Sequence, residues 1–133
     1  MKDPVAAVIT RLKADTAIAA IVGARVYRTS SVPADPTAPY IVVSRISAKR
    51  LNLTHNRIRV GQTRIQSSTF ASTDLAADNL SELIADSLNA IDNTYMAPGV
   101  FVIRIDDQGA VPDNNPDLDI WMYHRDFMIN YNV

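Results

Sequence analysis

The most regular pattern of apolar and polar positions lies between residues 62 and 91. Residues 62–71 contain no proline and no interior glycine but several β-branched or aromatic residues, a composition typical of a strand. From Ser72 to Ile91 the apolar residues recur instead at steps of three and four, which predicts an amphipathic helix capped by Ser72 or Thr73. Its apolar face consists of Ala76, Leu80, Leu83, Ile84, Leu88 and Ile91, and its polar face of Asp78, Ser81, Glu82 and Asp86. We expect the strands of the fold to pack under this helix.

Two shorter helices are predicted at the start of the chain. Asp3 is a suitable N-cap before Pro4, and an apolar stripe continues from there to Leu12. A second helix begins at Asp15 and ends at Gly23, because glycine readily adopts the left-handed conformation that closes a helix.

The next segments predict strands separated by a proline-rich loop. Residues 25–28 form a short strand, and three prolines make residues 29–39 a loop. Tyr40–Ile46 is apolar on both faces at its start, which is typical of a buried strand. Residues 47–61 are polar and basic, and their alternation around a turn at residues 54–56 predicts an extended hairpin arm.

The end of the chain predicts two strands joined by an acidic loop. Residues 93–99 form a connector, and residues 100–105 form a strand. Residues 106–117 are rich in aspartate and turn formers, so we expect a loop there. Residues 120–133 alternate like a strand with one buried face, which Arg125 interrupts.

These elements predict an α+β fold in which residues 1–133 form a single domain. We expect a single, mostly antiparallel sheet of four to five strands, with helices packed on it and the arm of residues 47–61 projecting as a β-hairpin. The main strands of this sheet are Tyr40–Ile46, Gln62–Ala71, Val100–Ile105 and Ile120–Tyr131.

The net charge of −1 conceals an uneven distribution along the chain. Residues 37–73 carry six basic side chains and no acidic one, whereas residues 74–133 carry eleven acidic side chains and two basic ones. Either these are ordinary solvated faces, or the basic surface of one copy meets the acidic surface of another. On the second interpretation, the candidate interface residues are Arg45, Lys49, Arg50, Arg57, Arg59, Arg64, Asp106, Asp107, Asp113 and Asp117.

Little in the sequence points to catalysis. There is no cysteine, which excludes disulfides and thiolate chemistry, and no apolar run as long as a membrane span, so we expect no membrane partner. His55 and His124 have no sequence neighbours that predict a metal or catalytic pair. The four glycines are isolated from one another, which excludes a phosphate-binding loop. We therefore expect no cofactor and no catalytic residue.

Two segments leave other functions open. The acidic residues between Asp106 and Asp119 could hold Ca²⁺ or Mg²⁺, although their spacing differs from an EF-hand, and a metal-dependent enzyme is thus an alternative. Residues 45–64 could contact the phosphates of nucleic acid, but they include no aromatic side chain for base stacking. The scarcity of chemical sites favours a protein that contacts other proteins.

The order of five segments resembles the tail completion proteins, or tail terminators, of long-tailed bacteriophages. The segments are Val-Gly-x-Arg-Val-Tyr (Val22–Tyr27), Ala-Pro-Tyr-Ile-Val-Val-Ser (Ala38–Ser44), Arg-Ile-Gln-x-x-x-Phe-Ala (Arg64–Ala71), the alanine-rich helix Leu75–Leu88 and the final Asp126-Phe127. The resemblance covers essentially the whole chain. It departs from the family pattern at Ser67 and Thr69, where larger apolar residues are expected.

The resemblance implies a structural protein of the virion tail or neck that is assembled in the host cytoplasm. Such proteins form a hexameric ring that caps the tail tube, ends its polymerisation and joins the tail to the head-side connector or stopper protein. The resemblance further implies that DNA passes through the ring without specific binding and that there is no enzymatic step. Another neck component, such as a head-tail stopper, is the alternative within this class.

Overall fold

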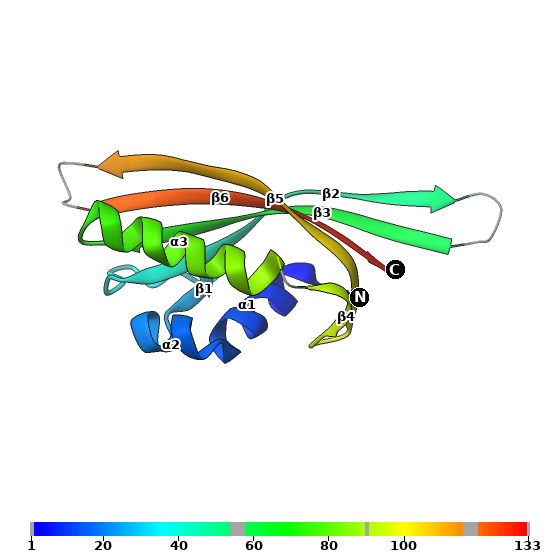
Figure 1. Ribbon diagram of the computed structural model, residues 1–133, viewed down its shortest axis with the longest axis horizontal. Helices are drawn as coiled ribbons and strands as arrows, with labels where there is room; N and C mark the ends of the chain where they lie inside the picture. The colour runs from blue at the N-terminus through cyan, green and yellow to red at the C-terminus, as the bar shows by residue number, and fades with distance from the viewer. Residues whose placement is uncertain (1, 54–57, 90, 116–119, 133) are drawn as a thin grey trace.

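A six-stranded sheet with α-helices on one face makes up the described part of the protein (Figure 1). The structure is a computed structural model that describes residues 2–53, 58–89, 91–115 and 120–132. The helices are α1 (Pro4–Ala14), α2 (Thr16–Val22) and α3 (Asp74–Asn89), with a short 3-10 helix η1 (Thr29–Ser31). The strands are β1 (Val26–Arg28), β2 (Tyr40–Leu53), β3 (Ile58–Ala71), β4 (Asp92–Met96), β5 (Val100–Asn115) and β6 (Ile120–Asn132). The predicted α+β fold is confirmed, but the sheet has six strands instead of four to five.

The strands follow the spatial order β1-β2-β3-β6-β5-β4. β1 is parallel to β2, and every other neighbouring pair is antiparallel, so the prediction of a mostly antiparallel sheet is confirmed. The two outermost strands are short. β1 lies along Ile41–Val43 of β2, and β4 lies along Val100–Arg104 of β5. Each therefore covers one part of the long strand beside it.

The predicted arm is the outer half of one long hairpin. β2 and β3 stay paired from Tyr40 opposite Phe70 to Leu53 opposite Ile58, with one irregularity between Arg45 and Ser47. The expected turn at residues 54–56 lies outside the described residues. In Figure 1 this outer half of the hairpin extends beyond the layer of helices. The arm is thus continuous with the central sheet and is not a separate pair of short strands.

The prediction of an acidic loop at residues 106–117 is wrong for residues 106–115, because β5 continues through them. Asp106 pairs with Met128 and Asp113 with Met122 on β6. The turn-forming composition is absorbed by a register shift between Asp107 and Ala110, where Gly109 has a φ of 95°. The connector expected at residues 93–99 likewise contains most of β4. Pairing with a neighbouring strand outweighs local turn preference in both segments.

The core lies between the helices and the facing side of the sheet. Val8 and Leu12 of α1, Ile65 of β3 and Phe127 of β6 are among its fully buried side chains. α1 begins as predicted, because the Asp3 side chain accepts a hydrogen bond from the backbone N–H of Ala6. The other face of the sheet carries polar residues such as Gln66 and His124 together with an apolar group of Tyr40, Val42 and Phe70, in which the Tyr40 and Phe70 rings stack with centroids 4.5 Å apart.

α3 is shorter than predicted and is rotated slightly from the expected face. It runs from Asp74 to Asn89, and Thr73 Oγ1 accepts a hydrogen bond from the N–H of Ala76, which confirms the capping prediction. Ala76 is exposed, however, and Ser81, which was assigned to the polar face, is fully buried. The fully buried side chains of the helix include Ala77, Leu80, Ile84 and Leu88.

Ser67 and Thr69, where the resemblance led us to expect larger apolar residues, form hydrogen bonds beneath α3. Thr69 Oγ1 donates to the carbonyl oxygen of Ala77 at 3.0 Å, and Ser67 Oγ donates to that of Arg125 at 3.3 Å. Both residues are fully buried. Because their hydroxyls are satisfied, small polar side chains let the helix approach the sheet at this point.

Candidate functional site

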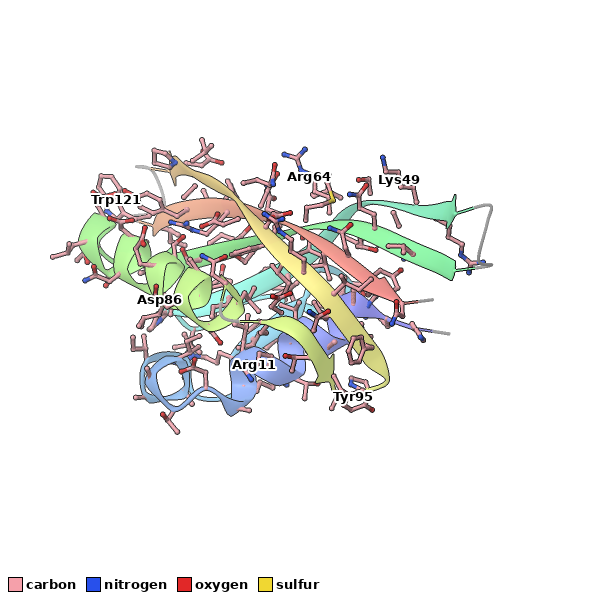
Figure 2. All side chains as sticks on the ribbon, turned by 45° about the vertical axis from the view of Figure 1, so that its right-hand side comes forward. Arg11, Lys49, Arg64, Asp86, Tyr95 and Trp121 are labelled. Carbon is pink, nitrogen blue, oxygen red and sulfur yellow. The ribbon has the colours of Figure 1, made fainter. Side chains whose placement is uncertain are left out.

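The predicted basic surface lies on β2 and β3. Arg45, Lys49 and Arg50 are exposed on β2, and none of them takes part in an ion pair with another described residue. Figure 2 shows Lys49 and Arg64 on the side of the sheet away from the helices. Arg59 lies on β3 in register with Asn52 of β2. Arg57 lies outside the described residues.

Arg64 differs from the other basic residues because it already has an acidic partner. Its Nε and one guanidinium nitrogen donate to Asp126 Oδ2 at 3.0 and 2.7 Å. Gln66 donates to the other oxygen of the same carboxylate at 3.1 Å. This cross-strand contact holds Arg64 against β6, so its charge is largely balanced within the chain.

The predicted acidic residues on β5 also have partners within the chain. The side chain of Arg104 donates to Asp106 Oδ1 at 2.7 Å, and Asp113 Oδ2 lies 3.2 Å from His124 Nε2. Asp107 accepts a hydrogen bond from Arg125 at 2.6 Å. Asp113 is the most exposed of the three carboxylates, with 60% of its side chain accessible. Asp117 lies outside the described residues.

Arg125 forms a buried cluster that sequence reasoning missed. It sits on the helix side of β6 and is 7% exposed. Its Nε donates to Ser81 Oγ at 3.0 Å, and its two terminal nitrogens donate to Asp107 at 2.6 Å and to Glu82 at 2.7 Å. The signal in the sequence is a single cation at an inward position of an otherwise apolar strand. The contacts tie α3 and β5 to β6, which assigns Arg125 a structural role.

His124 lies between a hydroxyl and a carboxylate on the uncovered face of the sheet. Its Nδ1 is 2.7 Å from Ser68 Oγ, and its Nε2 is 3.2 Å from Asp113 Oδ2. These residue types form the serine hydrolase triad when an exposed serine also faces an oxyanion hole. Ser68, however, is only 5% exposed, so its hydroxyl is poorly accessible to a substrate. The cluster therefore links β3, β6 and β5 instead of presenting a nucleophile.

A shallow pocket of about 560 Å³ lies beside the start of β5, and it is lined partly by Asp92, Asp106 and Asp107. Arg104 lines the same pocket and pairs with Asp106, while Asp107 is engaged by Arg125. Within the described residues, no three metal-binding side chains come close enough to hold an ion. The arrangement thus offers a cation little uncompensated negative charge.

Two further carboxylates join helices to strands by hydrogen bonds. The Arg28 guanidinium donates to Asp3 at 2.7 Å, and this hydrogen bond lowers the pKa of the Asp3 carboxyl. The Tyr123 hydroxyl donates to Asp74 Oδ1 at 2.8 Å. This bond raises the pKa of Tyr123 to about 12, because an ionised phenol would lie beside a carboxylate. Asp3 thereby links α1 to β1, and Asp74 links α3 to β6.

The described residues form an α+β fold with exposed cations on β2 and carboxylates on β5. No helix in the part of the chain that the structure describes is long and apolar enough to cross a membrane. The family model of tail completion protein gp17 matches residues 6–128. The chain therefore belongs to the tail completion protein family, and it is a structural protein of the phage virion tail. The resemblance stated from the sequence is confirmed.

A solved structure with the same fold comes from a virion particle. The chain is similar to one in a structure titled "Virion of native gene transfer agent (GTA) particle", with a TM-score of 0.73 and 19% sequence identity. The alignment covers 96% of this chain and 93% of that one. At this level of identity the likeness supports the fold. A comparison with curated proteins found no match.

Proposed function

We propose that this chain forms a closed ring that caps the tail tube, ends its polymerisation and joins the tail to the head-side connector or stopper protein. Membership of the tail completion protein family carries the proposal, because the family model spans residues 6–128. Six copies are the expected number. The partners are further copies of the chain, the tail tube protein and the head-side protein, while genome DNA passes through the ring without specific binding.

The distribution of charge supports contacts between copies. A closed ring needs two different and complementary surfaces on each subunit, because its contacts are heterologous. The exposed cations of β2 lie on one outer side of the four long strands, and the carboxylates of β5 lie on the other. Such pairs orient subunits and speed their association more than they hold them together. Apolar contacts then supply most of the affinity.

The proposal is tested with purified protein by light scattering during size-exclusion chromatography. We expect a particle of about six times the chain mass of 14.6 kDa. In a second assay, tail tube protein polymerises with or without an excess of this chain, and electron microscopy measures tube length. We expect shorter tubes with a density at one end. Two results together would overturn the proposal. The chain would have the mass of a single copy both when free and when bound to tubes, and the tubes would keep their length.

A further inference from the structure

Each outer strand of the long hairpins has a part of its edge that no described strand covers. β1 pairs with Ile41–Val43 of β2, and no other described strand lies on that side of residues 45–53. β4 pairs with β5 up to Arg104, and no other described strand lies on that side of residues 105–115. An uncovered edge presents backbone N–H and C=O groups that can pair with another strand. The described part of the chain therefore has two available strand edges, one at each lateral end of the same sheet.

Each uncovered edge also carries an exposed apolar side chain. Ile46 on β2 is 52% exposed and sits at the register irregularity between Arg45 and Ser47. Val111 on β5 is 64% exposed. Exposed branched apolar residues on an edge strand favour association instead of protecting against it. Pro112 beside Val111 has no N–H, and a register shift interrupts each strand, so a pairing of these edges is limited to a short segment.

The charges of the two edges are complementary. The part of β2 that carries Ile46 also carries Arg45, Lys49 and Arg50, and it contains no acid. The part of β5 that carries Val111 also carries three aspartates, and Arg104 and Arg125 already engage two of them, Asp106 and Asp107. The exposed Asp113 therefore supplies most of the negative charge of this edge. Like edges would repel one another, whereas unlike edges attract. The partner that fits the β2 edge is therefore the β5 edge of a second copy.

Strand directions are consistent with such a pair. Neighbouring strands in the order β2-β3-β6-β5 are all antiparallel, so β2 and β5 run in opposite directions within one subunit. A second copy in a similar orientation thus brings its β5 antiparallel to the first copy's β2. The uncovered parts lie towards opposite ends of the molecule, as the β2–β3 and β5–β6 hairpins show in Figure 1. The second copy is accordingly displaced along the strands.

We propose that the uncovered edge of β2 pairs antiparallel with the uncovered edge of β5 in a second copy, with Ile46 near Val111. Repetition of this pair joins the sheets of successive subunits around the ring. The inference rests on the ring proposed above and adds the backbone contact that closes it. Pairing of strand edges satisfies main-chain groups regardless of side chains, while the charges select which edges meet.

Cysteine cross-linking tests the contact directly, because the chain has no cysteine of its own. The variant carries Ser47→Cys with Ala110→Cys, and the matched control carries Ser47→Cys with Asn79→Cys on the exposed surface of α3. Within one subunit β2 and β5 are three strand spacings apart, about 14 Å, so a shorter thiol cross-linker joins only different copies. We expect a ladder of covalent oligomers for the edge variant and none for the control.

The outcomes separate the edge contact from the ring. A parent protein with the mass of a ring, whose edge variant gives no covalent oligomers, would overturn the edge contact and leave the ring intact. A parent protein with the mass of a single chain, alone and on the tube, would overturn both. Equal ladders in the edge variant and the control would show unspecific association and overturn the edge contact.

Proline substitution gives an independent test through the backbone. Successive residues of a strand point their N–H groups to opposite sides, so Ala48→Pro and Lys49→Pro remove one amide facing β3 and one facing the uncovered edge. The proline that removes the edge-facing amide should leave the melting temperature of the subunit at the parent value. We expect that variant to lose the ring. A proline variant with the parent melting temperature that still forms rings would contradict backbone pairing at this edge.

Discussion

Arg125 joins three elements through side-chain contacts beneath α3. Its guanidinium binds Asp107 on β5 and both Ser81 and Glu82 on α3, while its backbone belongs to β6. The cation is nearly buried, whereas 60% of the Glu82 side chain is exposed. The members of the cluster therefore differ in how much each one stabilises the fold.

Replacing Arg125 should destabilise the protein far more than replacing its exposed partner. We expect Arg125→Ala to cost about 3 kcal/mol, because it leaves Asp107 largely covered without its cation. Glu82→Ala, the matched control, should cost less than about 1 kcal/mol, as is usual for exposed ion pairs. Denaturant unfolding measures both free energies. Losses of similar, small size would show that the cluster contributes little to the fold.

The partners of individual charged residues were beyond prediction from the sequence. The composition indicated a basic middle and an acidic end, and exposed cations on β2 agree with it. Arg64 and Asp126, however, are 62 positions apart, and they meet only because β3 and β6 are neighbours in the sheet. His124 was likewise assigned no partner, since Ser68 reaches it through the same strand pair. The charge pattern therefore indicated which segments are basic or acidic, but it did not indicate which side chains pair.

At the scale of whole elements, periodicity and composition predicted the buried segments, and both failed where turn-forming residues lie in a paired strand. α3 and β6 were recognised because their apolar residues recur with a clear period, the inner part of β2 because it is apolar on both faces, and the inner part of β3 from its β-branched and aromatic composition. β5 was cut short at Ile105 because Asp, Gly, Pro and Asn favour turns when considered locally. Its continuation depends on β6, a neighbour that sequence composition does not reveal.

The apolar face of α3 should be the largest helical contribution to the core. Ile84 is fully buried against the sheet, so Ile84→Ala should cost about 2–5 kcal/mol through lost burial and a residual cavity. Leu75→Ala on the same helix provides the control. Leu75 is 68% exposed, and its truncation should change stability by no more than about 0.5 kcal/mol. An Ile84→Ala loss below about 1 kcal/mol in denaturant unfolding would contradict this packing.

At the scale of the whole molecule, the two charged edges lie on opposite sides of the sheet and towards opposite ends. This arrangement allows each subunit to contact two neighbours at once, which a ring requires. Exposed ion pairs contribute only about 0–1 kcal/mol each and weaken as salt increases. The charges should therefore govern the rate and orientation of assembly, and ring formation should depend on ionic strength.

Charge reversal tests this role of the edges. Lys49→Glu with Arg50→Glu puts two acids opposite the acidic edge of the next copy, so we expect weaker ring formation at low salt. Asp113→Lys in the same chain should restore part of the lost ring formation, because Asp113 is exposed. Asp107 is left unchanged, because it binds Arg125 inside the subunit. Light scattering across a protein concentration series, at low and high salt, measures the ring fraction.

The control must change the net charge equally without touching either edge. Arg11→Glu with Lys13→Glu does so, because both residues are exposed on α1. We expect this variant to assemble like the parent protein. If the Lys49 and Arg50 reversals also leave assembly at the parent level in low salt, the uneven charge has no part in the ring contact. Normal rings combined with impaired DNA passage after Asp113→Lys alone would instead indicate that the acidic edge lines the central hole, where negative charge keeps DNA from adhering.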